Sequence, residues 1–408
     1  MAAIRSFRAL RAVPDTASRV ASPPYDVMNV DEARELARGE PLSFLRVSRA
    51  EIELPSETDP YADAVYVRAA ENFRKIRVAA PFVTEAEPSL YCYRLQTTGH
   101  EQTGLTACYS LDEYDRGLIK RHEHTRLDKR TDRTRHLTEL GAQTGLVLLT
   151  YRATAEIDAL TESVCAGVPL FDFMAPDNVR HTVWRVPPAD VDLLVKAFEA
   201  VSALYVADGH HRMASASLAR EEFVRQRRPT VPLEADTVIA TAFPHTQVRI
   251  LPYNRVVQDL QKQSAREFLD QIKAKLPLRP GQPMPAKAGE VAMYLDGTWY
   301  NVRLTEFTHS VDRADALDVA RLHRDILAPL LGIGDIRRDS RIDFVGGSLG
   351  VAALQERVDQ GEAAVAFSMF PVTVDDLMTI ADEGSIMPPK STWFEPKLRD
   401  GLLIHLVV

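Results

Sequence analysis

The segment Leu204–Arg212 passes from apolar residues into the polar run Asp-Gly-His-His-Arg. The pattern predicts a short buried strand, a turn at Gly209 and a helix that begins near His210. The first four amides of a helix have no internal acceptor and the helix dipole is positive there, so this turn is suited to binding a phosphate. Gly209 would let the ligand approach the backbone, and Arg212 could donate a pair of hydrogen bonds to phosphate oxygens.

Asp208 adds a carboxylate at the end of the predicted strand. Because Mg²⁺ bound together with phosphates favours one or two carboxylate ligands, Asp208 is a candidate metal ligand. His210 and His211 are adjacent and therefore point in different directions, which makes them a poor metal pair. An ordinary turn, with Asp208 as a cap and two solvated histidines, is the alternative interpretation of the same residues.

The segment Lys120–His136 concentrates positive charge, with seven Lys or Arg against three acids. Such a cluster attracts phosphates, and a solvated face rich in salt bridges is the alternative. His122 and His124 have the spacing of two ligands on one face of a strand, with Glu123 opposite. A His-Glu-x-x-His zinc motif fails because position 126 is Arg.

Two further patterns could carry chemistry. Gly346–Gly350 matches the G-x-S-x-G nucleophile turn of serine hydrolases, with Asp376 or Asp382 and then His405 in the expected order, but a glycine-rich turn is the favoured interpretation. Near the C-terminus, Lys390, Ser391 and Thr392 offer a cation and hydroxyls, as an anion site or a structural loop would. The sequence contains no Walker or Rossmann glycine motif.

The elements that must position these residues follow from periodicity and capping signals. Strands are expected near 90–95, 104–110, 145–151, 179–186, 204–207, 237–243, 248–251 and 363–370, with a hairpin at 291–304 around Asp296-Gly297. Helices are expected after the capping box Asn29–Glu32, from Asp59-Pro60 to about Val78, and near 210–226, 315–331, 349–360 and 373–383. This mixture predicts an α+β, or mixed α/β, fold.

The length and composition of the chain limit its domain organisation, its partners and its location. A chain of 408 residues usually folds as two or three domains. The proline-rich segment 277–290 predicts a linker between a main α/β domain, 1–276, and a smaller α/β domain, 291–408. The net charge of −8 makes nucleic acid an unfavourable partner. The three cysteines lack metal-binding spacing, and Cys92 and Cys108 are expected to be buried thiols. The sequence shows no export signal and no apolar run of about 18 residues. Together these features predict a cytoplasmic protein.

Six motifs give the chain a family resemblance. They are Ser-Pro-Pro-Tyr-Asp-Val at 22–27, Arg-His-Glu-His-Thr-Arg at 121–126, Ala-Asp-Gly-His-His-Arg at 207–212, Pro-Tyr-Asn-Arg-Val-Val at 252–257, Arg-Ile-Asp-Phe-Val-Gly-Gly at 341–347, and Met-Pro-Pro-Lys-Ser-Thr-Trp-Phe-Glu-Pro-Lys at 387–397. In this order they resemble the family called domain of unknown function 1015, over nearly the whole chain. The Asp-Gly-His-His-Arg element is also similar to the phosphate-binding motif of the ParB/sulfiredoxin superfamily, which includes free-serine kinases.

The second resemblance implies a ParB/sulfiredoxin-like nucleotide-binding core and assigns roles by position. Sulfiredoxin activity is disfavoured, because that family needs a cysteine where this chain has His210. Glu123 is assigned on its chemistry alone. The predicted roles are catalysis by Glu123, Asp208 and His211; phosphate or nucleotide binding by Gly209, His210, Arg212, Arg121 and Arg126; substrate binding by Tyr25, Asp26, Lys390 and Ser391; and metal binding by Asp208 and Glu123.

These roles describe a nucleotide-dependent phosphotransferase that uses ATP or ADP with Mg²⁺. Its acceptor would be a small hydroxylated metabolite, with free L-serine as the candidate that the resemblance supplies. The alternatives are a nucleotide-binding or nucleotide-hydrolysing regulator of the ParB kind and, less favoured, a serine hydrolase. Nucleotide and small-molecule partners are expected, without a membrane, and a homodimer is compatible with the sequence.

Overall fold

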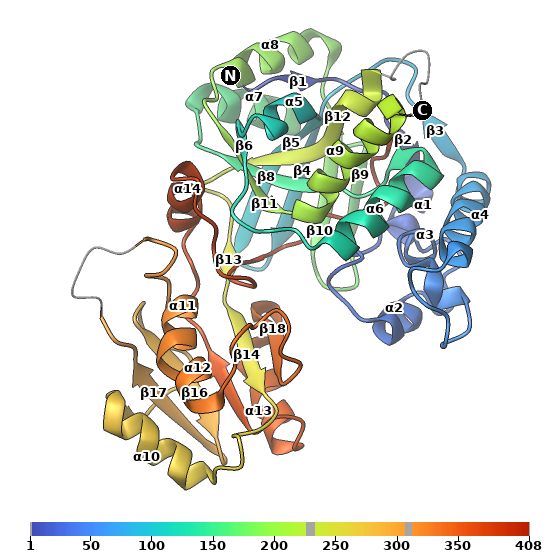
Figure 1. Ribbon diagram of the computed structural model, residues 1–408. Helices are drawn as coiled ribbons and strands as arrows, with labels where there is room; N and C mark the ends of the chain where they lie inside the picture. The colour runs from blue at the N-terminus through green and yellow to red at the C-terminus, as the bar shows by residue number, and fades with distance from the viewer. Residues whose placement is uncertain (1, 226–232, 307–311, 408) are drawn as a thin grey trace. The chain divides into compact units, whose positions relative to one another are not determined.

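A computed structural model describes residues 2–225, 233–306 and 312–407. The chain divides into two compact units (Figure 1). The first unit comprises Met1–Arg121, Thr125–Val248 and Pro396–Val408, and the second comprises His122–His124 and Arg249–Glu395. Within the described ranges, no helix is both long and apolar enough to cross a membrane.

This division differs from the predicted domains. The proline-rich segment 277–290 is not a boundary, because strand β15 (Leu278–Pro280) pairs there within the sheet of the second unit. The four prolines of that segment still allow a short strand at the edge of a sheet, where a missing backbone donor costs least. The last residues, from Pro396, return to the first unit rather than completing the second.

A mixed nine-stranded sheet forms the centre of the first unit and confirms the mixed α/β prediction. Only β6/β11 and β8/β12 are parallel pairs, and every other neighbouring pair is antiparallel. β1 (Ile4–Arg5) pairs with β5, and the remaining strands lie in the order β6 (Ile119–Lys120), β11 (Leu204–Asp208), β8 (Val147–Tyr151), β12 (Thr237–Pro244), β5 (His100–Ser110), β4 (Tyr91–Thr97), β10 (Arg180–Arg185) and β9 (Phe171–Met174).

Helices cover this sheet because its central strands are apolar on both faces, as predicted for residues 145–151. Figure 1 shows α9 and α6 in front of the sheet, and α9 contacts β8 and β12. The small residues Ala216 and Ala219 of α9 are buried in the same core as the strands. The helices of this unit are α1 (Pro14–Val20), α2 (Val30–Leu36), α3 (Leu45–Ser48), α4 (Asp63–Ala79), α5 (Leu111–Asp115), α6 (Leu127–Leu140), α7 (Ala155–Cys165), α8 (Pro188–Glu199) and α9 (His210–Arg225), with 3₁₀ turns η1 (Ala50–Glu53) and η2 (Leu233–Asp236).

The chain ends meet in the first unit. The backbone of Leu10 pairs with that of Ile404, and the backbone of Ser22 pairs with that of Asp400. Two small sheets extend these contacts, β2 (Leu10–Ala12) with β3 (Phe82–Thr84), and β7 (Ala142–Gln143) with β21 (His405–Leu406). The N-terminal and C-terminal segments, about 380 positions apart in the sequence, are therefore joined by backbone hydrogen bonds.

The second unit is built on a six-stranded antiparallel sheet. Its order is β15 (Leu278–Pro280), β17 (Thr298–Arg303), β16 (Glu290–Leu295), β19 (Val365–Ser368), β14 (Tyr253–Val257) and β18 (Ile342–Gly346), and β13 (Ile250–Leu251) pairs separately with β20 (Trp393–Phe394). The predicted Asp296-Gly297 turn is confirmed, with φ of 48° and 73° at the two positions. Its helices are α10 (Ala265–Lys275), α11 (Asp318–Leu322), α12 (Ala328–Leu331), α13 (Gly350–Asp359) and α14 (Val374–Asp382), with a π turn η3 (His323–Leu327) and a 3₁₀ turn η4 (Gly347–Leu349).

Some predicted boundaries were wrong. The helix expected from Asp59 begins at Asp63, because the Asp59 carboxylate accepts from the amide of Tyr61 and closes a turn instead. The segment with His122 and His124 is not a strand. The helix expected over 210–226 is confirmed as far as Arg225, and the last predicted residue, 226, lies outside the described residues.

Candidate functional site

The turn between β11 and α9 has the predicted strand–turn–helix geometry. Strand β11 ends at Asp208, and α9 begins at His210. Gly209 between them has a φ of +92°, which favours glycine, and its amide donates to Asp208 Oδ1 over 3.0 Å. A Cβ on Gly209 would lie 3.5 Å from Arg212 Nε, so glycine at this position lets the guanidinium lie close to the turn at the start of α9.

Asp208 is tied to a lysine that the sequence places 189 positions away. Its Oδ2 accepts from Lys397 Nζ over 3.0 Å, and the two side chains are 27% and 12% exposed. Although burial raises the pKa of the Asp208 carboxyl, the charges of Lys397 and Arg212 outweigh that effect and hold it well below its ordinary value. Asp208 is thus an ionised structural partner and a weak proton acceptor.

The same contacts bear on the predicted magnesium. Asp208 Oδ1 accepts from Gly209 N and Oδ2 accepts from Lys397, so each oxygen already has a donor. Lys397 supplies the positive charge that a metal ion would bring to this carboxylate. The residues around Asp208 therefore do not fit a Mg²⁺ ligand set, and no step below depends on a metal.

Arg212 is the cation aimed into this turn. Its Nη1 donates to the carbonyl of Leu146, and Nη2 lies 3.6 Å from Asp26 Oδ1. None of the residues that the structure describes accepts a hydrogen bond from the buried Nε or Nη2. Burial lowers the pKa of Arg212, but Asp26, Asp400 and Asp208 outweigh that effect and raise it, so the guanidinium is a permanent cation with two unused donors.

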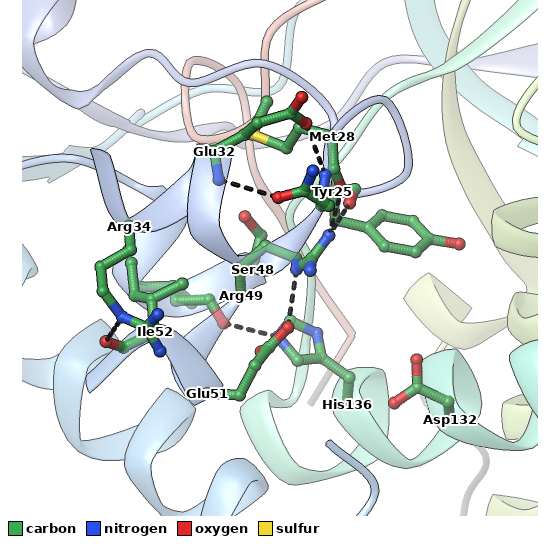
Figure 2. Close-up of polar contacts among 12 residues, drawn as sticks. Tyr25, Met28, Glu32, Arg34, Ser48, Arg49, Glu51, Ile52, Asp132 and His136 are labelled. Carbon is green, nitrogen blue, oxygen red and sulfur yellow. Dashed lines mark hydrogen bonds and ion pairs between the residues drawn. The ribbon is translucent and has the colours of Figure 1, made fainter. Parts of the chain in front are cut away.

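The Ser22–Val27 motif supplies Tyr25 and Asp26 to this place. Figure 2 shows Arg49 beneath the segment, where it donates to the carbonyls of Tyr25 and Met28 over 2.6 and 2.8 Å. The guanidinium carbon Cζ of Arg133 lies over the Tyr25 ring, 4.2 Å from the centroid of that ring. The two predicted substrate residues Tyr25 and Asp26 thus lie beside Arg212, held by contacts that sequence analysis did not anticipate.

Asp400 is a site residue that sequence analysis missed. It is 3% exposed, and its backbone pairs with Ser22 while the next amide, of Gly401, donates to Thr144. A Cβ on Gly145 would meet Asp400 Oδ1 at 2.5 Å, so only glycine leaves room for this carboxyl. Burial raises the pKa of Asp400 to about 7, with Arg212 opposing the rise and Asp26 adding to it. A local signal was the position of Asp400 three residues after the Met387–Lys397 motif.

A hollow of about 50 Å³ lies beside these groups in the first unit. A cavity of roughly 10–15 Å³ holds one water, so this one accommodates a group of a few heavy atoms but not a nucleoside. Its lining residues come from segments far apart in the chain: Tyr25, Ser48, Arg133, His136, Leu137, Ala142, Gln143, Thr144, Gly145, Arg212, Ser215, Val238 and Asp400.

The remaining predicted residues of the first unit are placed as follows. His211 Nε2 accepts from the amide of Arg126 over 3.1 Å, which in the neutral ring puts the proton on Nδ1. The Arg126 side chain donates from Nη2 to Asp128 Oδ2 over 2.7 Å, and Arg121 contacts Tyr114. His210 is buried at the start of α9. His211 is therefore oriented by the backbone that precedes α6, whereas the Arg126 side chain is paired with a neighbouring acid.

The other predicted residues belong to the second unit. Glu123 groups there with His122 and His124, so its pairing with Asp208 stays a prediction. The Lys390 carbonyl accepts from Arg255 Nη2 over 3.1 Å, and Lys390 Nζ lies 5.3 Å from the centroid of the Tyr253 ring. The Ser391 hydroxyl donates to the carbonyl of Pro388. These contacts agree with the structural-loop interpretation of that segment.

The serine hydrolase prediction finds no geometric support. Asp376 accepts from Thr373 in a capping box and pairs with Arg313 at 2.9 Å. His405 belongs to β21 in the first unit, and its Nε2 lies 3.1 Å from the carbonyl of Glu234. Asp376 and His405, two of the predicted partners of Ser348, therefore have structural roles of their own.

Comparison with known proteins gave one sequence match and several remote structural ones. A family model described as "Protein of unknown function (DUF1015)" matches residues 4–320. None of the curated proteins matches the chain. Among solved structures, the chain is similar to a conserved hypothetical protein from Pyrococcus furiosus (14% identity, 74% of this chain and 95% of that one, TM-score 0.35), to free serine kinase in complex with AMP (14%, 73% and 92%, 0.36) and to SbnI with C-terminal truncation from Staphylococcus aureus (13%, 74% and 87%, 0.40).

Proposed function

Since the chain belongs to the DUF1015 family, whose description assigns no activity, we propose a function from the chemistry of its own site. The protein is a phosphotransferase that moves a phosphoryl group from ATP or ADP to the hydroxyl of a small metabolite. Free L-serine is the first acceptor to test, because of the resemblance carried by the Asp-Gly-His-His-Arg motif. The proposal concerns the first unit alone.

The observation that carries the proposal is the state of Arg212. In the described part of the chain its Nε and Nη2 are buried and have no acceptor. Leaving two charged donors without acceptors costs stability, and such groups are usually satisfied by an ion or ligand. A phosphate oxygen pair fits their fork geometry, and the amides at the start of α9 donate at the same place.

The neighbouring residues support a phosphate rather than another anion. Gly209 has a φ of +92° at the turn, and the His211 ring beside it is oriented by the amide of Arg126, which donates to its Nε2. Asp208 and Lys397 neutralise each other, so the cation that remains for the ligand is Arg212, whose Nη2 lies 3.6 Å from Asp26 Oδ1. Phosphoryl transfer depends mainly on positioning and charge stabilisation, which this set of residues supplies.

The experiment compares wild type with Arg212→Gln, and with Arg225→Gln as a control on the same helix, where the side chain is 71% exposed. Each protein is incubated with ATP or ADP and a panel of hydroxyl compounds that begins with L-serine, and phosphorylated product is measured by mass spectrometry. Nucleotide binding is followed by thermal shift.

We expect Arg212→Gln to weaken nucleotide binding roughly ten- to hundredfold, since hydrogen bonds between charged groups contribute about 1.5–3 kcal/mol. The Arg225→Gln control should bind like wild type. Nucleotide binding with slow hydrolysis and no acceptor-dependent product would favour the regulatory alternative. Wild type that neither binds nor consumes nucleotide would contradict the proposal.

A further inference from the structure

The hollow in the first unit is lined by polar side chains that are nearly all used internally. The Ser48 hydroxyl donates to the Phe44 carbonyl, and the Ser215 hydroxyl donates to the Arg212 carbonyl. Ring nitrogen Nε2 of His136 pairs with the carbonyl of Val47 over 2.9 Å (Figure 2). The two hydroxyl hydrogens and His136 Nε2 are therefore already engaged with backbone carbonyls.

Two lining residues differ from the rest. Over the described ranges, Asp400 Oδ1 and the Arg212 atoms Nε and Nη2 are buried atoms without a hydrogen-bond partner. The Asp400 side chain lies against Gly145, where a Cβ would overlap Oδ1. The carboxyl can therefore take this position only because residue 145 is glycine. The hollow thus presents a cation that can only donate beside a carboxyl that accepts when ionised.

A ligand that satisfies both groups must bring an anionic oxygen to Arg212 and an O–H group to Asp400. We propose that this hollow holds the hydroxyl end of the phosphoryl acceptor, with Asp400 as the base that takes its proton and Arg212 on the phosphoryl oxygens. This assignment rests on the proposed function and adds the base and the class of acceptor. The small volume favours a primary alcohol at the end of a small metabolite.

The chemical step balances within these groups. The acceptor O–H bond breaks and its proton passes to Asp400 Oδ1. The oxygen electron pair forms a bond to the terminal phosphorus of the nucleotide, and the bond from that phosphorus to its bridging oxygen breaks with both electrons left on the nucleotide. Asp400 then releases its proton to solvent when the product leaves, which restores the carboxylate.

The charges around Asp400 suit this role. Arg212 of α9, Arg133 of α6 and Arg399 on the same segment favour the ionised carboxyl, whereas Asp26 opposes it. Burial outweighs the three cations and leaves the pKa of Asp400 at about 7, so both protonation states are accessible near neutral pH. The sequence-based choice of Asp208 as base is less suitable, because Lys397 keeps its carboxylate ionised and occupied.

The test compares wild type, Asp400→Asn and Gly145→Ala, with Asp192→Asn on the exposed face of α8 as the control. Phosphoryl transfer from ATP or ADP to the hydroxyl panel is measured between pH 5.5 and 8.5, and nucleotide binding is followed by thermal shift. Gly145→Ala narrows the hollow beside the carboxyl without removing the acid, so it serves as a second, independent variant.

We expect the wild-type rate to rise through pH 7 and then level off. Asp400→Asn should lose at least about a hundredfold in transfer and lose this pH dependence, because a general base contributes roughly 10²–10⁴-fold. Gly145→Ala should lose transfer as well, while both variants keep nucleotide binding. Transfer by Asp400→Asn at the wild-type rate and pH profile overturns the role of Asp400 alone, whereas absence of transfer by wild type overturns the proposed function together with it.

Discussion

The substitution Asp400→Asn replaces a buried carboxyl with an uncharged amide of nearly the same shape. In the folded protein burial raises the pKa of Asp400 to about 7, whereas an aspartate in an unfolded chain has a pKa of about 3.9. Between these two values the folded protein keeps a proton that the unfolded chain has released. Raising the pH across this range therefore lowers the free energy of unfolding of the wild type.

The size of the effect follows from the difference between the pKa of Asp400 in the folded protein and in the unfolded chain. From pH 5 to the folded pKa near 7 there are two pH units, each corresponding to about 1.4 kcal/mol, so wild type should lose about 3 kcal/mol by pH 8. Asp400→Asn carries no titrating group there and escapes this loss. We therefore expect its stability relative to wild type to increase by about 3 kcal/mol between pH 5 and pH 8.

Hydrogen exchange of the C-terminal segment measures this difference within the first unit. The amides of Gly401 and Ile404 donate to Thr144 and Leu10, so their protection reports opening of this unit. Exchange rates at pH 5 and pH 8 are corrected for intrinsic chemistry, and Asp192→Asn serves as the exposed control. A difference between Asp400→Asn and wild type that stays constant with pH would refute the reasoning.

Two further substitutions test the contacts that build the site. Lys397→Met removes the partner of Asp208 and should destabilise the first unit by about 2–3 kcal/mol at pH 7, toward the low end for a broken buried pair since Asp208 is 27% exposed. Without Lys397 the pKa of Asp208 should rise, since only Arg212 and His210 among the charges that lower it remain. The loss of stability should therefore shrink as the pH falls, and a pH-independent loss measured by urea denaturation would argue against the ion pair. Gly401→Ala should destabilise the protein by at least about 2 kcal/mol, because Gly401 has a φ of +84° and an added Cβ would lie 2.6 Å from the Phe44 ring. The control Gly334→Ala, where a Cβ meets open space and φ is not positive, should leave the melting temperature nearly unchanged. Equal melting temperatures of the two variants would show that the contact with Phe44 relaxes freely.

Local structure was largely predictable. The buried strand at 147–151, the capping box at Asn29, the turn at Asp296-Gly297 and the start of α9 at His210 all agree with the sequence patterns. Each depends on residues within one or two turns of one another, where side-chain alternation, capping bonds and glycine conformation act directly. The strand–turn–helix geometry at Gly209 belongs to the same class of prediction.

The site as a whole was not predictable in this way. Lys397 and Asp400 reach the turn through backbone pairing of the C-terminal segment with Ser22 and Thr144, contacts that leave no periodic trace in the sequence. The predicted linker at 277–290 was wrong for a related reason, because prolines mark a break in hydrogen bonding without showing whether the chain leaves a sheet or runs along its edge.

The amino-acid sequence by itself determined the strand–turn–helix around Gly209 and the types of side chain available to it. Tertiary structure decided the pKa of each acid in the site. Asp208 and Asp400 are the same residue type, but Lys397 keeps one charged, while burial against Gly145 raises the pKa of the other to about 7. The physical reason is that a pKa depends on the charges and the solvent within a few ångströms, and those neighbours are chosen by the fold rather than by adjacency in the chain.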